Sequence, residues 1–172
     1  MTKPFTPEQI ALSPFWTGVG SRKTPEYILA IMAAIAMKHA SLGYILRSGR
    51  APGADTAFER GAGNMKETFV ASDATPAAME IAATYHKAWT RLNEYVRKLH
   101  GRNAFQVLGR NLDYPSRGLL CWTSDACQCH ENRSIVTGGT GTAISIADAY
   151  GVPISNLANG KQLEKWRKWV NM

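Results

Sequence analysis

Short apolar segments alternate with helix-like segments along this chain, and the alternation limits the folds that are open to it. Residues 15–21, 44–49 and 68–71 each contain a short apolar run, and they are separated by segments with helical features at 24–43 and 53–62. This order is typical of a parallel sheet, because parallel strands need a crossover connection. The sequence therefore predicts an α/β fold.

The second half of the chain continues the pattern with a longer helical stretch. Residues 76–108 are helical in character, and we expect an interruption near Gly101. Residues 117–123 and 151–158 predict two further buried strands, and the polar residues 124–134 between them predict a loop.

The two ends of the chain differ in character. Residues 1–13 predict an irregular arm, whereas residues 161–170 predict an amphipathic closing helix. We expect Trp166 and Trp169 of this helix to pack against a core or a subunit interface. No linker-like tract divides the chain, so we predict one domain over residues 1–172. Its expected architecture is a Rossmann-like parallel-sheet sandwich with helices on both faces.

The charge of the chain favours anionic partners. Lys and Arg outnumber Asp and Glu by 20 to 13, which gives a net charge of +7. Nucleotides, RNA and DNA all remain open as partners. Residues 86–117 are especially rich in Lys and Arg, and this zone is either a solvated helical face or a surface that faces phosphates.

Composition also bears on the compartment. No apolar run of about 18 residues occurs, and the N-terminus lacks the apolar core of a secretory signal. The three cysteines are clustered and odd in number, which fits a reducing compartment. We expect a soluble, cytoplasmic protein with no membrane partner.

The glycine-rich stretch at 137–142 is the strongest candidate for a binding motif. Its glycines allow backbone amides to approach an anion closely, and the helix that follows adds its dipole. Threonine hydroxyls add further donors. A tight turn before an ordinary helix is the alternative. The candidate phosphate-binding residues are Gly138, Gly139, Thr140, Gly141 and Thr142.

Two other strand ends have similar residues. Gly18, Gly20 and Ser21 follow the first apolar segment, and Ser48 and Gly49 end the second. The carboxyl ends of parallel strands line one crevice, where ligands of open α/β sheets bind. The sequence therefore predicts a phosphorylated nucleotide at this edge of the sheet.

Four segments together resemble the SLOG superfamily, which includes the DprA and LOG proteins and small stand-alone members, some of them from bacteriophages. They are GVGSRKTP (18–25), LRSGRAPGADTAFERGA (46–62), RNAFQVLG (102–109) and GGTGTAISIADAYGVPISNLA (138–158). The chain is most similar to the stand-alone, DprA-like members. The resemblance implies a Rossmann-like sheet, a nucleotide in the crevice, and homo-oligomers that are dimers or larger.

The chain departs from the LOG enzymes where their activity resides. In their PGGxGTxxE motif, Thr137 replaces the proline here and Ser145 replaces the glutamate that takes part in N-glycosidic cleavage. A serine cannot act as a base at neutral pH. Of the MxxRKxxM motif only Arg102 is kept. The other positions hold Leu99, Asn103 and Gln106.

Asp55 and Glu59 are the candidate substitutes for the missing carboxylate. They lie four residues apart on one face of the expected helix, with Asp55 in its first turn at the crevice. Asp55 could instead only complement the helix dipole, and Glu59 could be solvated or ion-paired. Arg22, Arg102 and Asn103 are candidate contacts to phosphate or base.

We expect no metal site and no cofactor. Cys127, Cys129 and His130 form a C-x-C-H cluster with Cys121 nearby, but a structural zinc site needs a second pair of ligands.

Three functions remain open. The first is a binding protein for a nucleotide or nucleotide-derived signal, acting as a sensor or sequestering agent. The second is a nucleotide N-glycosidase of LOG type that uses Asp55 or Glu59. The third is a DprA-like protein that binds single-stranded DNA, which requires affinity that falls steeply with salt.

Overall fold

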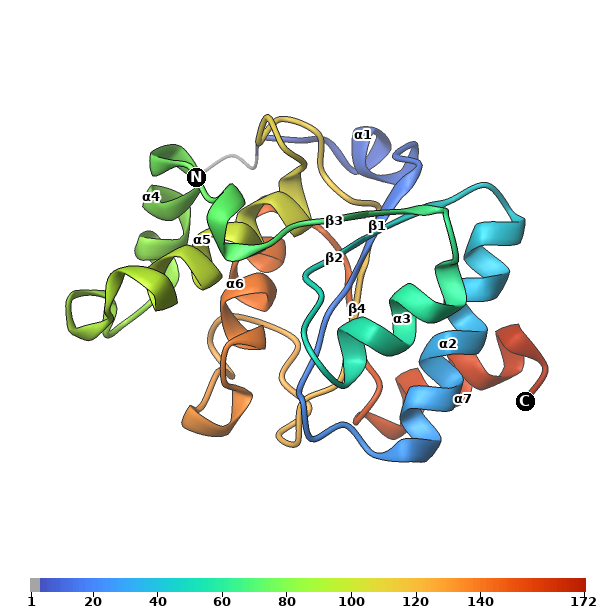
Figure 1. Ribbon diagram of the computed structural model, residues 1–172. Helices are drawn as coiled ribbons and strands as arrows, with labels where there is room; N and C mark the ends of the chain where they lie inside the picture. The colour runs from blue at the N-terminus through green and yellow to red at the C-terminus, as the bar shows by residue number, and fades with distance from the viewer. Residues whose placement is uncertain (1–3) are drawn as a thin grey trace.

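The computed structural model describes residues 4–172, in which five strands form one parallel sheet (Figure 1). The strands are β1 (Phe15–Gly18), β2 (Ile45–Ser48), β3 (Lys66–Thr68), β4 (Leu119–Cys121) and β5 (Ile154–Asn156). Their spatial order is β3-β2-β1-β4-β5, and every neighbouring pair is parallel. The predicted α/β, Rossmann-like parallel-sheet fold is confirmed.

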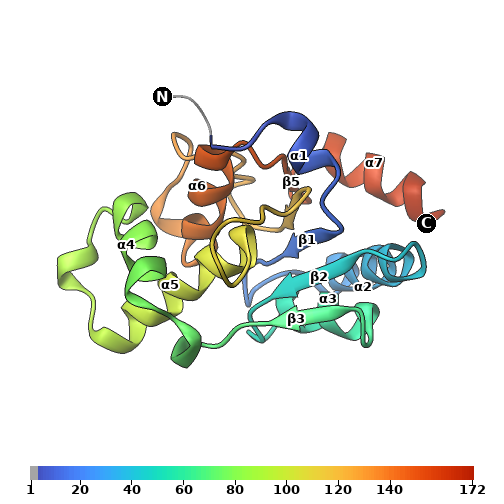
Figure 2. The same cartoon turned by 90° about the horizontal axis from the view of Figure 1, so that it is seen from above.

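The helices cover both faces of this sheet (Figure 2). They are α1 (Pro7–Ala11), α2 (Glu26–Ser41), α3 (Ala54–Ala62), α4 (Pro76–Tyr85), α5 (Glu94–Leu108), α6 (Thr140–Tyr150) and α7 (Gly160–Val170). The described residues also form short 3-10 helices, which are η1 (Ala71–Asp73), η2 (Trp89–Arg91) and η3 (Ile135–Thr137).

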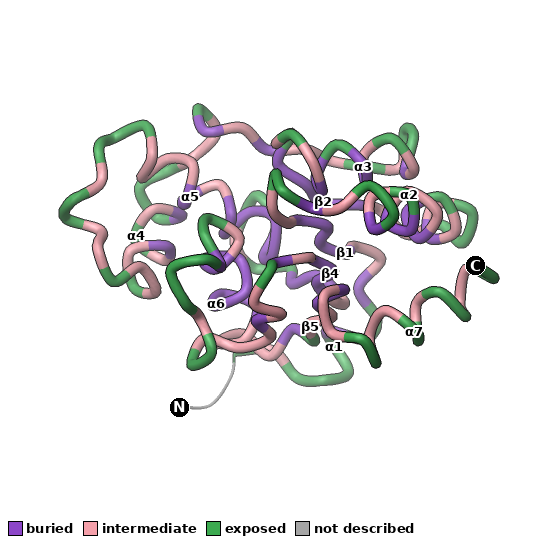
Figure 3. Tube along the Cα trace, turned by 90° about the horizontal axis from the view of Figure 1, so that it is seen from below, coloured by how far each residue is buried: buried purple, intermediate pink, exposed green. Residues whose placement is uncertain are grey.

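Each face of the sheet has its own apolar core. Trp16, Met32 and Phe58 are central to the core that α2, α3 and α7 form with one face. Phe105 and Ile144 belong to the core on the other face, which α4, α5 and α6 cover. Figure 3 shows the buried residues concentrated along the strands and the inner sides of the helices.

The order of the strands creates a crevice at the carboxyl edge of the sheet. From the central strand β1 the chain moves outward through β2 to β3, and it then returns to β4 and β5 on the other side of β1. The connections that leave β1 and β4 therefore diverge, because they lead to opposite faces of the sheet. In open parallel sheets this switch point is where ligands bind.

The expected break in the long helical stretch was wrong. The interruption lies at residues 86–93, between α4 and α5, and Asn93 caps α5 by accepting a hydrogen bond from the Val96 N–H at 2.9 Å. Gly101 instead lies inside α5, where a Cβ would come within 2.8 Å of Met79 Cγ. Glycine is therefore needed at this position for the close contact between α5 and α4.

The expected irregular arm was also wrong in part. Residues 7–11 form α1, which Thr6 and Gln9 cap with a reciprocal pair of hydrogen bonds. Residues 1–3 of the expected arm lie outside the described residues. Within residues 4–172 no helix combines the length and the apolar character needed to cross a bilayer.

Two further boundaries differ from expectation. Helix α2 begins at Glu26 with Pro25 as its N-cap, whereas Thr24 donates its hydroxyl to the Ser21 carbonyl at 2.7 Å. The third strand ends at Thr68, because the chain turns into η1 where the sequence had predicted more strand.

The closing helix packs as expected. Trp166 and Trp169 of α7 lie against the core of the α2 face, with their rings 5.7 and 4.8 Å from the ring of His39. Burial lowers the pKa of His39 to about 4, so the ring is neutral at physiological pH and packs as an aromatic group.

Candidate functional site

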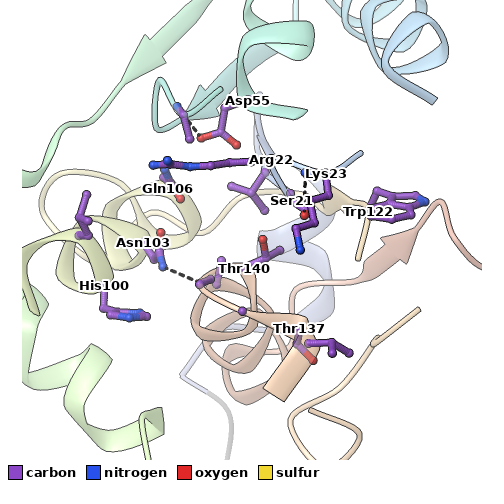
Figure 4. Close-up of a pocket in the computed structure, with 18 of the residues that line it drawn as sticks. Ser21, Arg22, Lys23, Asp55, His100, Asn103, Gln106, Trp122, Thr137 and Thr140 are labelled. Atoms are coloured by element: carbon purple, nitrogen blue, oxygen red, sulfur yellow. Dashed lines mark hydrogen bonds between the residues drawn. The ribbon is translucent and has the colours of Figure 1, made fainter. Parts of the chain in front are cut away.

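A cleft of about 680 Å³ lies at the switch point of the sheet (Figure 4). The loops after β1 and β4 form two of its walls, α5 forms the third, and the first turn of α6 closes it. Figure 4 shows Asp55 and Gln106 at one end of this cleft and Thr137 and Thr140 at the other. The cleft therefore has two chemically different ends.

The structure brings most of the predicted site residues together. Those that line the cleft are Gly20, Ser21, Arg22, Asp55, Arg102, Asn103, Gly138, Gly139 and Thr140. The remaining predicted residues, which are not part of its lining, are Gly18, Ser48, Gly49, Glu59, Gly141 and Thr142.

The cradle end consists of residues 138–140, and its backbone N–H groups are available to a ligand. The N–H groups of Gly138, Gly139 and Thr140 donate no hydrogen bond to any residue between 4 and 172. Gly138 lies in the loop directly before α6. Its φ of +63° is in the left-handed region that favours glycine. Three free donors at the start of an 11-residue helix suit an anion.

Side chains outside the cradle hold it in place. Asp125 accepts hydrogen bonds from the hydroxyls of Thr137 and Ser134, the latter at 2.7 Å. Burial acts to raise the pKa of Asp125, but these hydrogen bonds outweigh it and hold the pKa below its ordinary value. On the other side, Asn103 Nδ2 donates to the Gly139 carbonyl at 3.3 Å, which ties the cradle to α5.

Asp55 lies at the opposite end of the cleft, in the first turn of α3. Its carboxyl group is 3% exposed, and Oδ2 accepts the backbone N–H groups of Gly49 and Ala51 at 3.2 and 3.3 Å. Burial raises the pKa of Asp55 to about 7, although these two hydrogen bonds and the charge of Arg102 oppose the shift. The carboxyl group can therefore gain and lose a proton near neutral pH.

Arg102 and Gln106 complete this end from α5. The Arg102 guanidinium donates to the Gly49 carbonyl through Nη1. A Cβ on Gly49 would come within 2.1 Å of Gln106 Nε2, so only glycine permits this approach. Gln106 Nε2, Gln106 Oε1 and Arg102 Nε are buried, and none of these three atoms forms a hydrogen bond with residues 4–172.

Ser145 and Thr142 point into a polar network behind the cradle. Arg133 donates to Ser145 Oγ at 3.1 Å through Nη1 and to Thr142 Oγ1 at 3.2 Å through Nη2. His130 Nδ1 lies 2.7 Å from Ser145 Oγ, and His100 Nδ1 lies 2.8 Å from Thr142 Oγ1. Ser145 is fully buried, so its hydroxyl faces this polar network and not the cleft.

The other predicted residues outside the lining have structural contacts. Ser48 donates its hydroxyl to the Gly18 carbonyl at 2.9 Å and so joins β2 to β1. Glu59 accepts the Arg50 N–H at 2.8 Å. Gly141 is packed beneath Arg133, whose Nε would lie 2.3 Å from a Cβ at this position.

The cysteine-rich loop has internal hydrogen bonds. Cys127 Sγ lies 3.2 Å from the Cys129 carbonyl and donates to it, and Cys121 is fully buried in β4. In the described part of the chain, no three His, Cys, Asp or Glu side chains are grouped as metal ligands would be.

The basic residues of segment 86–117 separate in space. Arg102 lines the cleft, whereas Arg117 lies over the Tyr44 ring at 4.2 Å and donates to the Ser13 carbonyl near the start of β1. Arg97 donates to the carbonyls of Trp89 and Thr90. Arg102 and Arg117 therefore lie at different ends of the sheet.

Sequence reasoning missed several residues of the cleft, which are Lys23, His100, Gln106 and Trp122. The positions 99, 102, 103 and 106 have the spacing of one helix face, and this spacing could have indicated Gln106. His100 lines the cleft as well, but burial lowers its pKa to about 4, so it adds no charge at neutral pH.

Comparison of the chain with protein-family models, with curated proteins and with solved structures gives no match.

Proposed function

We propose that this protein binds a phosphorylated nucleotide, or a signal derived from one, in the cleft at the carboxyl edge of its sheet. The observation that carries the proposal is the row of three unbonded backbone N–H groups at Gly138, Gly139 and Thr140, which opens into the cleft at the start of α6. Such groups bind phosphate because the donors and the helix dipole act together.

Charge in the cleft supports an anionic ligand. Arg22, Lys23 and Arg102 line it, against the single carboxyl group of Asp55. Because the pKa of Asp55 is about 7, roughly half of these carboxyl groups are uncharged at neutral pH. The cationic side chains therefore dominate the electrostatics of the cleft.

Apolar side chains in the lining of the cleft support a ligand with an aromatic base. Leu99 of α5, Trp122 after β4 and Ile135 of η3 line the cleft together with the polar groups. A volume of about 680 Å³ lies within the range of small-molecule sites. A phosphate at the cradle and a base against these side chains would use both kinds of surface.

Binding without turnover is the form of the proposal that the site favours. Ser145 stands where the LOG enzymes have their glutamate, and its hydroxyl is buried between His130 and Arg133. A sensor or a sequestering protein needs the cradle but no catalytic carboxylate.

Calorimetric titration with a panel of nucleoside mono- and diphosphates tests this proposal. We expect micromolar or tighter affinity for at least one nucleotide. Thr140→Glu places a negative charge in the cradle and should abolish binding, whereas Thr140→Gln has the same size and should retain it. An acid in the first helical turn is favourable, so Thr140→Glu should fold as well as the native chain. A panel without heat or thermal shift would refute the proposal.

The N-glycosidase is the second candidate, because Asp55 is a buried carboxyl group in the cleft with a pKa of about 7. A group with such a pKa is suited to proton transfer at neutral pH. Release of free base from a bound nucleotide, measured by chromatography, would establish this activity. Asp55→Asn should then remove it, and an Asp55→Asn protein with full activity would exclude Asp55 from the reaction.

A further inference from the structure

The deep end of the cleft contains a buried carboxamide that the fold itself does not use. Gln106 is 1% exposed, and among residues 4–172 neither its Nε2 nor its Oε1 has a hydrogen-bond partner. A buried polar group without a partner is costly, and an apolar side chain of similar size would avoid the cost. Packing therefore does not explain a glutamine here.

Further unsatisfied groups surround this carboxamide. Arg102 Nε is buried and forms no hydrogen bond with residues 4–172, and a Cβ on Gly49 would lie 3.1 Å from it and 2.1 Å from Gln106 Nε2. The Gly49 N–H donates to Asp55 Oδ2, whereas Asp55 Oδ1 accepts no hydrogen bond from the described chain. Two donors and two acceptors thus lie around Gly49 at one end of the cleft.

Hydroxyl groups are the ligand chemistry that best fits this mixture. A hydroxyl donates one hydrogen bond and accepts others, so neighbouring hydroxyls can donate to Asp55 and Gln106 Oε1 while they accept from Gln106 Nε2. A second phosphate fits poorly because its oxygens only accept hydrogen bonds, whereas Asp55 Oδ1 and Gln106 Oε1 are acceptors that need a donor. A base is better placed against the apolar Leu99 and Trp122 than at this polar end.

We propose that Gln106 is the specificity-determining residue of the cleft and that, with Asp55, it selects phosphate esters whose sugar carries neighbouring hydroxyl groups. This inference rests on the proposed function, because the cradle at residues 138–140 would hold the phosphate of the same ligand. The sugar would then reach from the cradle toward Asp55 and Gln106.

Calorimetry with three probes tests the inference, namely inorganic phosphate, 2-deoxyribose 5-phosphate and ribose 5-phosphate. All three contain the group that the cradle binds, but only ribose 5-phosphate carries the additional neighbouring hydroxyl. We expect ribose 5-phosphate to bind about tenfold more tightly than the deoxy sugar, which is the usual effect of one buried hydrogen-bonding group.

Gln106→Met and Gln106→Leu identify the residue responsible. Both variants should fold, because the Gln106 amide makes no hydrogen bond within residues 4–172. For each variant, we expect the dissociation constants of the two sugar phosphates to differ by no more than about twofold. The affinity for inorganic phosphate should equal that of the native protein. Gln162→Met is the matched control, because Gln162 lies on α7 with its Oε1 bonded to Ser155 Oγ at 3.0 Å. It should keep the full discrimination.

The outcomes separate this inference from the proposed function. Equal affinity of the native protein for the two sugar phosphates would overturn the inference but leave the phosphate cradle in place. Discrimination that persists in both Gln106 variants would overturn it as well. If none of the three probes binds, the proposed function fails, and the inference fails with it.

Discussion

At the scale of single residues, the cleft contains buried polar groups that lower the stability of the folded protein. Asp55 is a buried carboxyl group, and Arg102, whose charge acts on it, donates to a backbone carbonyl instead of to the carboxylate. Gln106 is a buried amide without a partner in the described chain. Groups of this kind tend to mark binding or catalytic sites, because selection for stability alone would remove them.

Asp55→Asn should stabilise the protein, and the gain should grow with pH. Burial raises the folded-state pKa of Asp55 from 3.8 to about 7, so above pH 4 the unfolded chain loses this proton before the folded protein does. Stability due to Asp55 therefore falls as pH rises from 4 to 7. The Asn oxygen can still accept the N–H groups of Gly49 and Ala51.

Urea unfolding of both proteins at several pH values measures the difference. We expect almost none at pH 4 and about 2 to 4 kcal/mol in favour of Asp55→Asn above pH 7. A difference that does not change with pH would show that Asp55 titrates normally in the folded protein.

Gly138→Ala and Gly139→Ala should differ although the two glycines are adjacent. Gly138 has a φ of +63° and a ψ of −151°, a combination that is essentially confined to glycine, so an alanine there should cost about 1 to 3 kcal/mol. Gly139 has a helical φ of −62°, and a Cβ there would contact nothing within 4 Å. Thermal unfolding should show destabilisation by Gly138→Ala alone. Equal stability of the two variants would contradict the described conformation of the cradle.

At the scale of elements, α5 and α6 together determine the cleft. Helix α5 supplies Arg102, Asn103 and Gln106, and the cradle at residues 138–140 leads into α6. Arg133 donates hydrogen bonds to the hydroxyls of Thr142 and Ser145 on α6 and to the carbonyl of Tyr85 at the end of α4. These bonds join α6 to α4, and the hydrogen bond from Asn103 to the Gly139 carbonyl joins the cradle to α5.

Arg133→Met should therefore loosen the cradle without unfolding the sheet. It removes three hydrogen bonds that join α6 to α4, and we expect a loss of about 1 to 3 kcal/mol. Hydrogen exchange should show faster exchange at the start of α6 and little change in β1. Arg60→Met, at an exposed position on α3, is the control. Unchanged protection of α6 in Arg133→Met would contradict this role.

The sequence predicted the positions of helices and strands better than the side-chain contacts between them. The strands β1, β2, β4 and β5 were found because each lies within a segment that contains a short apolar run. Gly101 misled the prediction, since a glycine that lets two helices pack closely looks the same in sequence as a helix break. Thr142 and Ser145 lie on the helix that the sequence predicted after the glycine-rich stretch, but their hydroxyls contact Arg133 and His130 instead of lining the cleft. Both partners belong to the loop between β4 and α6, whose path the sequence did not reveal.

At the scale of the whole molecule, the strand order places loops from distant parts of the chain at one crevice. Asp55, Arg102 and Gly138 are far apart in sequence, yet all three line the cleft. Which residues converge there depends on the order β3-β2-β1-β4-β5, which local patterns do not specify. The homo-oligomer that the resemblance implies stays a prediction, and light scattering in solution would test it.

The distribution of charge predicts weak binding of single-stranded DNA. Of the basic residues in segment 86–117, Arg102 lines the cleft at the carboxyl edge of the sheet and Arg117 lies near the start of β1, so these two charges are not part of one compact patch. We expect the logarithm of the binding constant to fall with the logarithm of salt concentration with a slope shallower than about −2. Fluorescence anisotropy with a labelled oligonucleotide measures it. A slope of about −4 or steeper would favour the DNA-binding alternative.

The most direct test of the phosphate cradle is the nuclear magnetic resonance of its own amide groups. In a ¹⁵N-labelled protein titrated with nucleoside monophosphates, hydrogen bonds to phosphate should shift the backbone N–H signals of Gly138, Gly139 and Thr140 more than those of α7. We predict these shifts, with saturation, for at least one nucleotide. Signals of residues 138–140 that stay unchanged across the whole nucleotide panel, or saturating shifts confined to another surface, would contradict nucleotide binding in this cleft.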